Sequence, residues 1–149
     1  MSNSNRQVIL VSSDNVTFTI PATVANLSIF IKMFTDDCNI EDEENEPIPM
    51  LRVNSKVLKM IIDFMQYYHI DPMTTIEKPL VSHHIGDIVQ PWYATFIENV
   101  KNEDMLYDMV NAGNYMFIQS LLELSCAMVA LSIKEKSISE IHNELYITT

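Results

Sequence analysis

The sequence predicts a single α+β domain, in which a few short strands precede a largely helical second half. Before residue 54, apolar residues form short β-branched runs or alternate with polar ones, and after it they recur at helical spacing. The chain has 149 residues, of which 48% are hydrophobic and two are glycine. A chain of this size and composition can bury one core and is unlike a disordered acidic tail.

The first predicted element is a β-hairpin. Residues 8–11 are an apolar run rich in β-branched side chains, residues 12–15 are typical of a turn, and residues 17–20 alternate polar and apolar side chains. Pro21 ends the pattern. The hairpin is therefore expected to bury one face, while the polar residues 1–7 are expected to form a flexible N-terminus.

Two short helices and an acidic loop are predicted next. Residues 22–34 change to helical spacing, and Ser28 is placed to be the N-cap of the second helix. Residues 36–46 hold seven of the 20 acidic residues and are expected to form a solvated loop. Residues 48–53 return to an extended pattern, which the prolines among and before them limit to a short or edge strand.

An amphipathic helix is predicted from Asn54, which is a good N-cap, to about Tyr68. Val53 and Leu58 occupy the two positions of a hydrophobic staple around that cap. Residues 70–91 hold three of the six prolines and show little periodicity. They are therefore expected to form a long connecting loop.

Two helices are predicted after this loop. The first is short and aromatic and covers residues 92–100. Asn102 is expected to cap the second, with Glu103 and Asp104 in its first turn, where they complement the helix dipole. Gly113 lies inside the second helix, where glycine costs about 1 kcal/mol relative to alanine. A close backbone approach is therefore expected at Gly113.

A third helix is predicted over residues 118–134, and a capping box at residues 137–140 predicts a separate short helix after it. The third helix is apolar nearly all round. Its main stripe consists of Ile118, Leu121, Leu122, Cys126, Val129 and Ile133, whereas Leu124, Met128 and Leu131 lie on other faces. Two interpretations are open: the helix is fully buried, or one face packs on the core while another binds a partner.

Charge and composition exclude several classes of partner. Twenty acidic residues against nine basic ones give a net charge of -11, whereas nucleic acid and anionic membranes require clustered basic groups. No run approaches the roughly 20 apolar residues that span a bilayer, and the N-terminus has no secretory signal. Cys38 and Cys126 form no CxxC pair. We expect a protein of a reducing compartment, with no nucleic-acid or membrane partner.

No enzyme, metal site or cofactor is expected. His83, His84 and Asp87 are the densest set of candidate metal ligands. Adjacent histidines suit neither face of a helix, and the segment is predicted to be loop, so we interpret them as solvated side chains. The chain lacks a glycine-rich phosphate loop and a G-x-S-x-G motif, and Cys126 is interpreted as a small hydrophobe. No residue is therefore assigned a catalytic role.

Three stretches carry a resemblance to a known family: residues 28–32 (SIFIK), 92–97 (WYATFI) and 111–122 (NAGNYMFIQSLL). They resemble the S-x-x-I-K, W-x-x-x-F-(L/I) and A-A-N-Y-L-D-I-x-x-L-L motifs of the Skp adaptors (S-phase kinase-associated protein one) of SCF ubiquitin ligases. The stretches occur in the same order as in that family. Elongin C shares the fold but lacks the Trp-led helix, so it fits less well.

The resemblance implies a BTB/POZ fold with a small mixed sheet and a helical bundle over residues 8–116, and partner-binding helices over residues 117–149. In this family the first part docks on the N-terminal domain of a cullin, and the C-terminal helices bind the F-box of a substrate receptor. Asn114 and Tyr115 fall on the cullin-contacting positions. The F-box-facing positions are Leu122, Cys126, Val129, Ile133, Ile141 and Leu145. The resemblance also implies that other subunits perform catalysis and that the protein resides in the cytoplasm and nucleus.

Departures from the family pattern leave an alternative open. Phe117 replaces an acidic residue of the family, and Gly113 replaces an alanine. The family usually has a further acidic helix that wraps the F-box, so we expect either a shortened form or a reduced grip on that partner. The alternative is a divergent BTB-type module that binds one partner or self-associates as a weak homodimer. Which F-box proteins and substrates are involved does not follow from the sequence.

Overall fold

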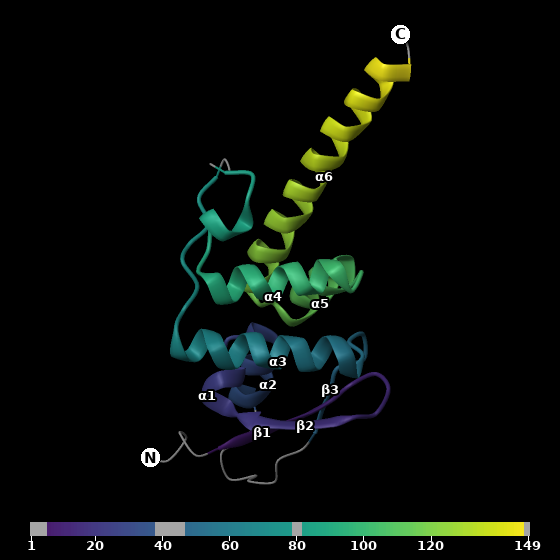
Figure 1. The fold of residues 1–149 in the computed structure, drawn as a ribbon. Helices are drawn as coiled ribbons and strands as arrows, with labels where there is room; N and C mark the ends of the chain where they lie inside the picture. The colour runs from purple at the N-terminus through teal and green to yellow at the C-terminus, as the bar shows by residue number, and fades with distance from the viewer. Residues whose placement is uncertain (1–5, 38–46, 79–81, 148–149) are drawn as a thin grey trace.

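The computed structural model describes residues 6–37, 47–78 and 82–147, with side chains described within 6–34, 47–78 and 82–133. These residues contain one three-stranded sheet and six α-helices (Figure 1). The predicted α+β class is confirmed.

The sheet is small and mixed. Strands β1 (Gln7–Val11) and β2 (Thr17–Pro21) form the predicted antiparallel hairpin, in which Val8 pairs with Ile20. Strand β3 (Ile48–Pro49) adds to the other side of β1 in parallel, so the order is β2-β1-β3. The two-residue length of β3 confirms the short edge strand.

The β1–β2 turn is tied to the start of a distant helix through Asp14. Its carboxylate accepts hydrogen bonds from the Ser12 hydroxyl (2.6 Å) and from the Ser55 amide (2.7 Å) and hydroxyl (2.6 Å). These donors favour the charged form, so they lower the pKa of Asp14 from 3.8 to about 2. An ionised Asp14 therefore links the β1–β2 turn to Ser55, which lies 41 positions later in the sequence.

Two short helices follow the hairpin, α1 (Ala22–Ala25) and α2 (Ile29–Asp37), as predicted. Ser28 caps α2, because its Oγ accepts the Ile31 amide at 3.2 Å. The predicted acidic loop begins later than expected, since Asp36 and Asp37 are still helical. Phe34–Asp37 contains no glycine or proline to end the helix. The rest of that loop lies outside the described residues.

Helix α3 (Ser55–Ile70) begins with its predicted cap, since Asn54 Oδ1 accepts the Val57 amide at 2.9 Å. The connection from α3 to α4 (Pro91–Asn102) includes a 3₁₀ turn, Ile85–Asp87. Its described parts are docked on the core rather than merely solvated: they bury Met73, Ile76, Ile85 and Val89.

Tyr93 anchors this connection from α4. Its hydroxyl donates to the Asp71 carbonyl oxygen, and burial raises the pKa of Tyr93 above its ordinary value. Gln90 adds a second anchor, because its side chain accepts the Thr74 amide (2.8 Å) and donates to the Pro72 carbonyl (2.9 Å). Polar bonds thus fix both ends of the connection.

The predicted cap at Asn102 is wrong. Asn102 is the last residue of α4, and α5 (Leu106–Met116) begins after Met105, which makes no side-chain capping bond. The chain reverses within three residues, with Asp104 in the left-handed region at φ 60°. Aspartate tolerates that conformation better than most residues, so Asp104 serves the turn instead of the helix start.

The predicted break between two C-terminal helices is also wrong. A single helix, α6, runs from Gln119 to Ile147 and extends away from the rest of the molecule (Figure 1). No glycine or proline lies between Lys134 and Ser137, so good helix formers carry the helix through this segment. A capping box starts a helix only where the preceding backbone leaves the helical region.

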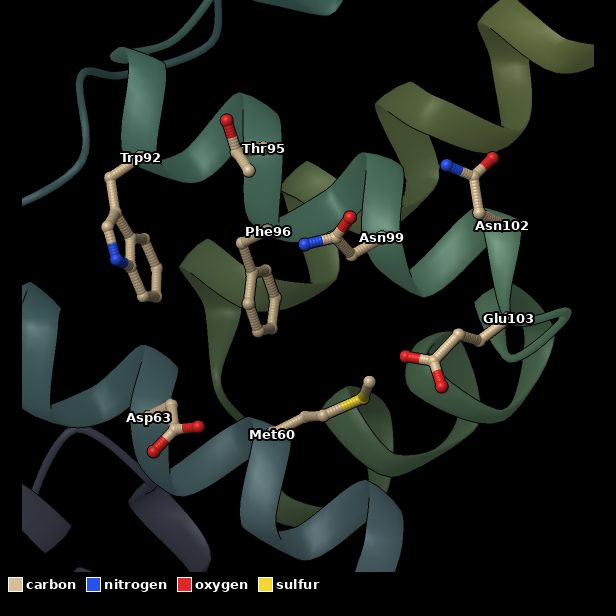
Figure 2. Close-up of a pocket in the computed structure, with 8 residues that line it drawn as sticks. All are labelled: Met60, Asp63, Trp92, Thr95, Phe96, Asn99, Asn102 and Glu103. Atoms are coloured by element: carbon tan, nitrogen blue, oxygen red, sulfur yellow. The ribbon is translucent and has the colours of Figure 1, made fainter.

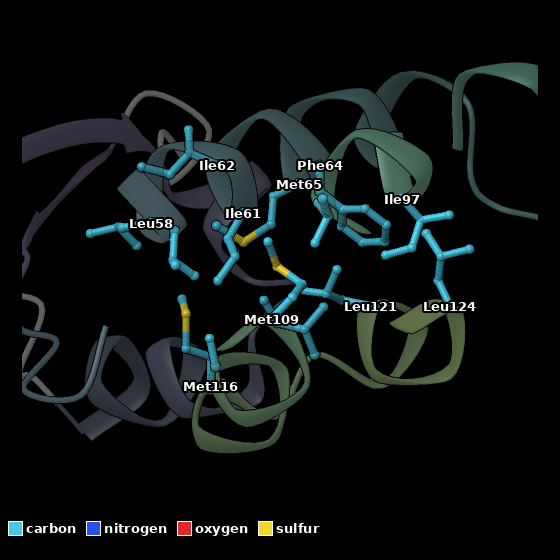
Figure 3. Packing of buried hydrophobic residues seen from close by; sticks show 14 of the residues in the cluster. Leu58, Ile61, Ile62, Phe64, Met65, Ile97, Met109, Met116, Leu121 and Leu124 are labelled. Atoms are coloured by element: carbon cyan, nitrogen blue, oxygen red, sulfur yellow. The ribbon is translucent and has the colours of Figure 1, made fainter. Parts of the chain in front are cut away.

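The core is one continuous cluster from the sheet to the first turns of α6. Figure 3 shows Ile61 and Met65 of α3 facing Met109 and Leu121. Gly113 of α5 is buried here, and a methyl group on it would lie 3.5 Å from the Leu122 amide nitrogen. That is ordinary contact, so the expected close approach exists but does not require glycine.

Candidate partner-binding surfaces

An exposed apolar stripe runs along α6. We call it the outer stripe; its described members are Leu122, Cys126, Val129 and Ile133. Leu122 and Val129 are partly buried, Cys126 is exposed and Ile133 is 55% exposed. Their spacing of four, three and four residues keeps them on one side of the helix. The stripe is therefore only partly covered by the rest of the molecule, and Cys126 and Ile133 are its exposed members.

The structure shows which side of α6 faces the core, a point that the sequence had left open. Leu124, Met128 and Leu131, which lie off the main stripe, are buried, together with Leu121. Leu121 had been grouped with the stripe that holds Ile133. Both faces are apolar, so periodicity alone could not assign one of them to the core. The structure supports the second interpretation, in which one face packs and another stays exposed.

Two predicted F-box positions, Ile141 and Leu145, lie in the helical backbone of α6. Their side chains lie outside the described residues, so their assignment stays a prediction.

The predicted cullin-contacting residues lie at the end of α5. Asn114 is exposed and Tyr115 is half-buried. The Tyr115 ring lies 5.2 Å from the ring of Phe30 on α2, and Phe30 lies 5.1 Å from Phe34. Tyr115 therefore belongs to an aromatic cluster that joins two helices far apart in the sequence.

Further apolar side chains surround that cluster. We call this surface the aromatic patch; it consists of Ile29, Phe30, Met33, Phe34, Tyr115 and Phe117. Met33 is 57% exposed, and Ile29, Phe34 and Phe117 are also exposed. The Ile29 amide donates to the Phe117 carbonyl at 3.2 Å, which brings the two helix ends together. Sequence reasoning missed this patch, although the apolar residues all round α2 were a signal for it.

Phe117 is unusual in conformation as well as exposure. It ends α5 in the left-handed region, with φ 53° and ψ 54°. An L-residue other than glycine is disfavoured there by roughly 1–2 kcal/mol. The sequence thus keeps a bulky exposed ring at a position where glycine would be the usual residue.

The histidines considered as metal ligands give no such site in the described residues. His83 and His84 are exposed and precede the 3₁₀ turn, and the described part of the chain holds no metal-binding group of three or more His, Cys, Asp or Glu. Among the described helices, none combines the length and apolar character needed to cross a membrane.

The comparisons with known proteins agree over nearly the whole chain. Residues 6–70 match the family model "Skp1 family, tetramerisation domain". The chain is 33% identical to "S-phase kinase-associated protein 1 homolog" of Tetrahymena thermophila, over 99% of this chain and 86% of that protein. It is 34% identical to "E3 ubiquitin ligase complex SCF subunit sconC" of Arthroderma benhamiae, over 98% and 86%.

A third relative, "Skp1-related protein" of Caenorhabditis elegans, is 33% identical over 95% of this chain and 81% of its own length. The mixed sheet and helices described above fit the BTB/POZ fold of such proteins. With three relatives above 30% identity along nearly its full length, this chain belongs to the Skp1 family.

Proposed function

We propose that this protein is a non-catalytic adaptor of an SCF-type ubiquitin ligase, which links a cullin scaffold to F-box substrate receptors. The observation that carries the proposal is the outer stripe, a partly exposed apolar surface on a helix whose other face already packs on the core. A monomer gains nothing from apolar side chains held in water, whereas a partner can bury them. Residence in the cytoplasm and nucleus is part of the same proposal.

The two partners are assigned to separate surfaces. The F-box is assigned to residues 117–149, with Leu122, Cys126, Val129 and Ile133 as contacts, continued by Ile141 and Leu145. The cullin N-terminal domain is assigned to residues 8–116, around Asn114 and Tyr115. The outer stripe and the aromatic patch share no residue, and they occupy different helices. That separation supports a bridge in which both partners bind at once.

The proposal is tested by binding of the full chain to an F-box domain and to a cullin N-terminal fragment, each measured by calorimetry. Ile133→Asp should abolish F-box binding and spare cullin binding, because a buried unpaired charge costs several kcal/mol. Asn114→Ala and Tyr115→Ala should weaken cullin binding and spare the F-box.

Each variant is the control for the other partner. Circular dichroism verifies that all three variants are folded. Intact F-box binding by Ile133→Asp would contradict the assignment of the outer stripe, and absence of both partners' binding in the unmodified chain would contradict the adaptor function.

The alternative is a BTB-type module that binds one partner or forms a weak homodimer. The aromatic patch would suit a second copy of the chain as well as a cullin, since it is apolar and exposed. Sedimentation velocity over a hundredfold concentration range, with and without the cullin fragment, separates these cases. A dimer that the fragment does not dissociate would favour self-association through another surface.

A further inference from the structure

A third feature lies between α3 and α4, a pocket of about 490 Å³ that we call the Trp92 pocket (Figure 2). Eight residues line it, and they include Met60, Asp63, Trp92, Phe96 and Glu103. None of the eight belongs to the outer stripe or to the aromatic patch. Its volume falls within the range of roughly 300–1,000 Å³ that is typical of ligand pockets.

The apolar wall of this pocket is a column of near-parallel rings. Trp92 stacks on Tyr67 at 4.3 Å and 2°, and on Phe96 at 5.3 Å and 10°. Figure 2 shows Trp92 and Phe96 pointing from α4 towards α3, with Met60 reaching up from α3. Another planar group can extend such a column, and aromatic faces attract cations in particular.

The two charged residues of the pocket lining are both acidic, and its other polar residues are neutral. Asp63 and Glu103 are both lining residues, and none of the eight is Lys, Arg or His. Each carboxylate meets one lysine of α3: Lys59 lies 3.2 Å from Asp63, and Lys56 lies 3.0 Å from Glu103. Both lysines are largely exposed, and such surface pairs contribute little. A carboxylate can accept several hydrogen bonds, so acceptor capacity remains for a second cation.

We propose that the Trp92 pocket binds an arginine side chain from an extended segment of a protein partner. The guanidinium is planar and always charged, so it can continue the ring column while it donates in a fork to a carboxylate. The aliphatic stem of arginine would pack against Met60. The net charge of -11 favours approach of a basic segment. This contact goes beyond the proposed adaptor function and is independent of it.

Trp92 is the one tryptophan of the chain, so its fluorescence reports directly on the pocket. The full chain is titrated with acetyl-Gly-Arg-Gly-amide and, in parallel, with the citrulline and lysine analogues of that peptide. The arginine peptide should change the emission saturably, with a Kd on the order of 1 mM, as a single desolvated cation contact allows. The neutral citrulline peptide, which has nearly the same shape, should bind at least about fivefold more weakly.

The double variant Asp63→Asn with Glu103→Gln should bind the arginine peptide at least about fivefold more weakly. The control variant Asp108→Asn changes an exposed acid outside the pocket and should bind the peptide as the unmodified chain does. An equal response to citrulline, or no response to any peptide, would overturn the proposal. An equal response to lysine would overturn the choice of arginine. The double variant should bind the F-box domain and the cullin fragment as the unmodified chain does. A negative result for the arginine contact would therefore leave the adaptor function standing, and the reverse also holds.

Discussion

Both sides of α6 carry apolar residues, but one side is buried and the other is partly exposed. On one side Leu121 is fully buried and Leu124 packs beside it, whereas on the other Ile133 is 55% exposed. Helix α6 packs on α5 and α4, and Ile133 lies mostly outside that packing. Apolar side chains thus mark both a core and a candidate interface, and only their neighbours distinguish the two.

This difference separates stability from binding. A buried leucine contributes to the free energy of unfolding through packing and the hydrophobic effect. An exposed isoleucine contributes little to folding and becomes important only when a partner covers it. Variants on the two sides of α6 should therefore have opposite effects on these two measurements.

The largest effect should come from a matched pair on α6. Leu121→Ala should lower the free energy of unfolding by about 2–5 kcal/mol, because it leaves a cavity in a fully packed site. Ile133→Ala should change it by less than about 0.5 kcal/mol. Urea unfolding of both variants measures this. Equal destabilisation would show that the two sides of α6 are not distinct.

A second effect concerns the joint between α2 and α5, beneath the aromatic patch. Ser28 is fully buried, and its hydroxyl donates to the Met116 carbonyl at 2.6 Å as well as capping α2. Ser28→Ala should cost about 1–3 kcal/mol, because it leaves a buried carbonyl and a helix N–H unpaired. The exposed Ser13→Ala is the control, expected to be nearly neutral in the same urea titration.

A third effect tests whether the aromatic patch has been kept at the expense of stability. Phe117→Gly should raise the free energy of unfolding by about 1 kcal/mol, since glycine occupies the left-handed region without strain. Phe117→Ala removes the same ring but keeps the strain, so it should not stabilise. Thermal unfolding compares the two variants. If they are equally stable, backbone strain at Phe117 is not the cause.

The smallest effect is expected away from α6 and the aromatic patch, at Asp14 in the turn between strands β1 and β2. The pKa of Asp14 in the folded protein, about 2, lies below its ordinary 3.8. Between these two pKa values the unfolded chain binds more protons than the folded protein. The contribution of Asp14 to the free energy of unfolding is therefore complete above about pH 4 and is lost as the pH falls towards 2. Asp14→Asn should remove this part of the pH dependence. Urea titrations at pH 5 and pH 2.5 should show a smaller difference for the variant than for the unmodified chain.

Much of the local structure was determined by the sequence itself. Ser28 and Asn54 cap the helices that they were predicted to cap, and the hairpin pairs in the expected place. Caps, turns and strand alternation depend on residues only a few positions apart, so short-range patterns predict them. The same holds for the motifs that led to the Skp1 family, which the relatives confirm.

The tertiary structure alone decided which apolar surfaces are buried and which stay exposed. The side of α6 that packs, the aromatic patch joining α2 to α5, and the Trp92 pocket between α3 and α4 all depend on elements far apart in the sequence. Helical periodicity defines the faces of a helix but does not say what covers each one. For this protein, the sequence determined most of the helices and the caps at Ser28 and Asn54, whereas long-range packing decided which apolar residues remain available to a partner.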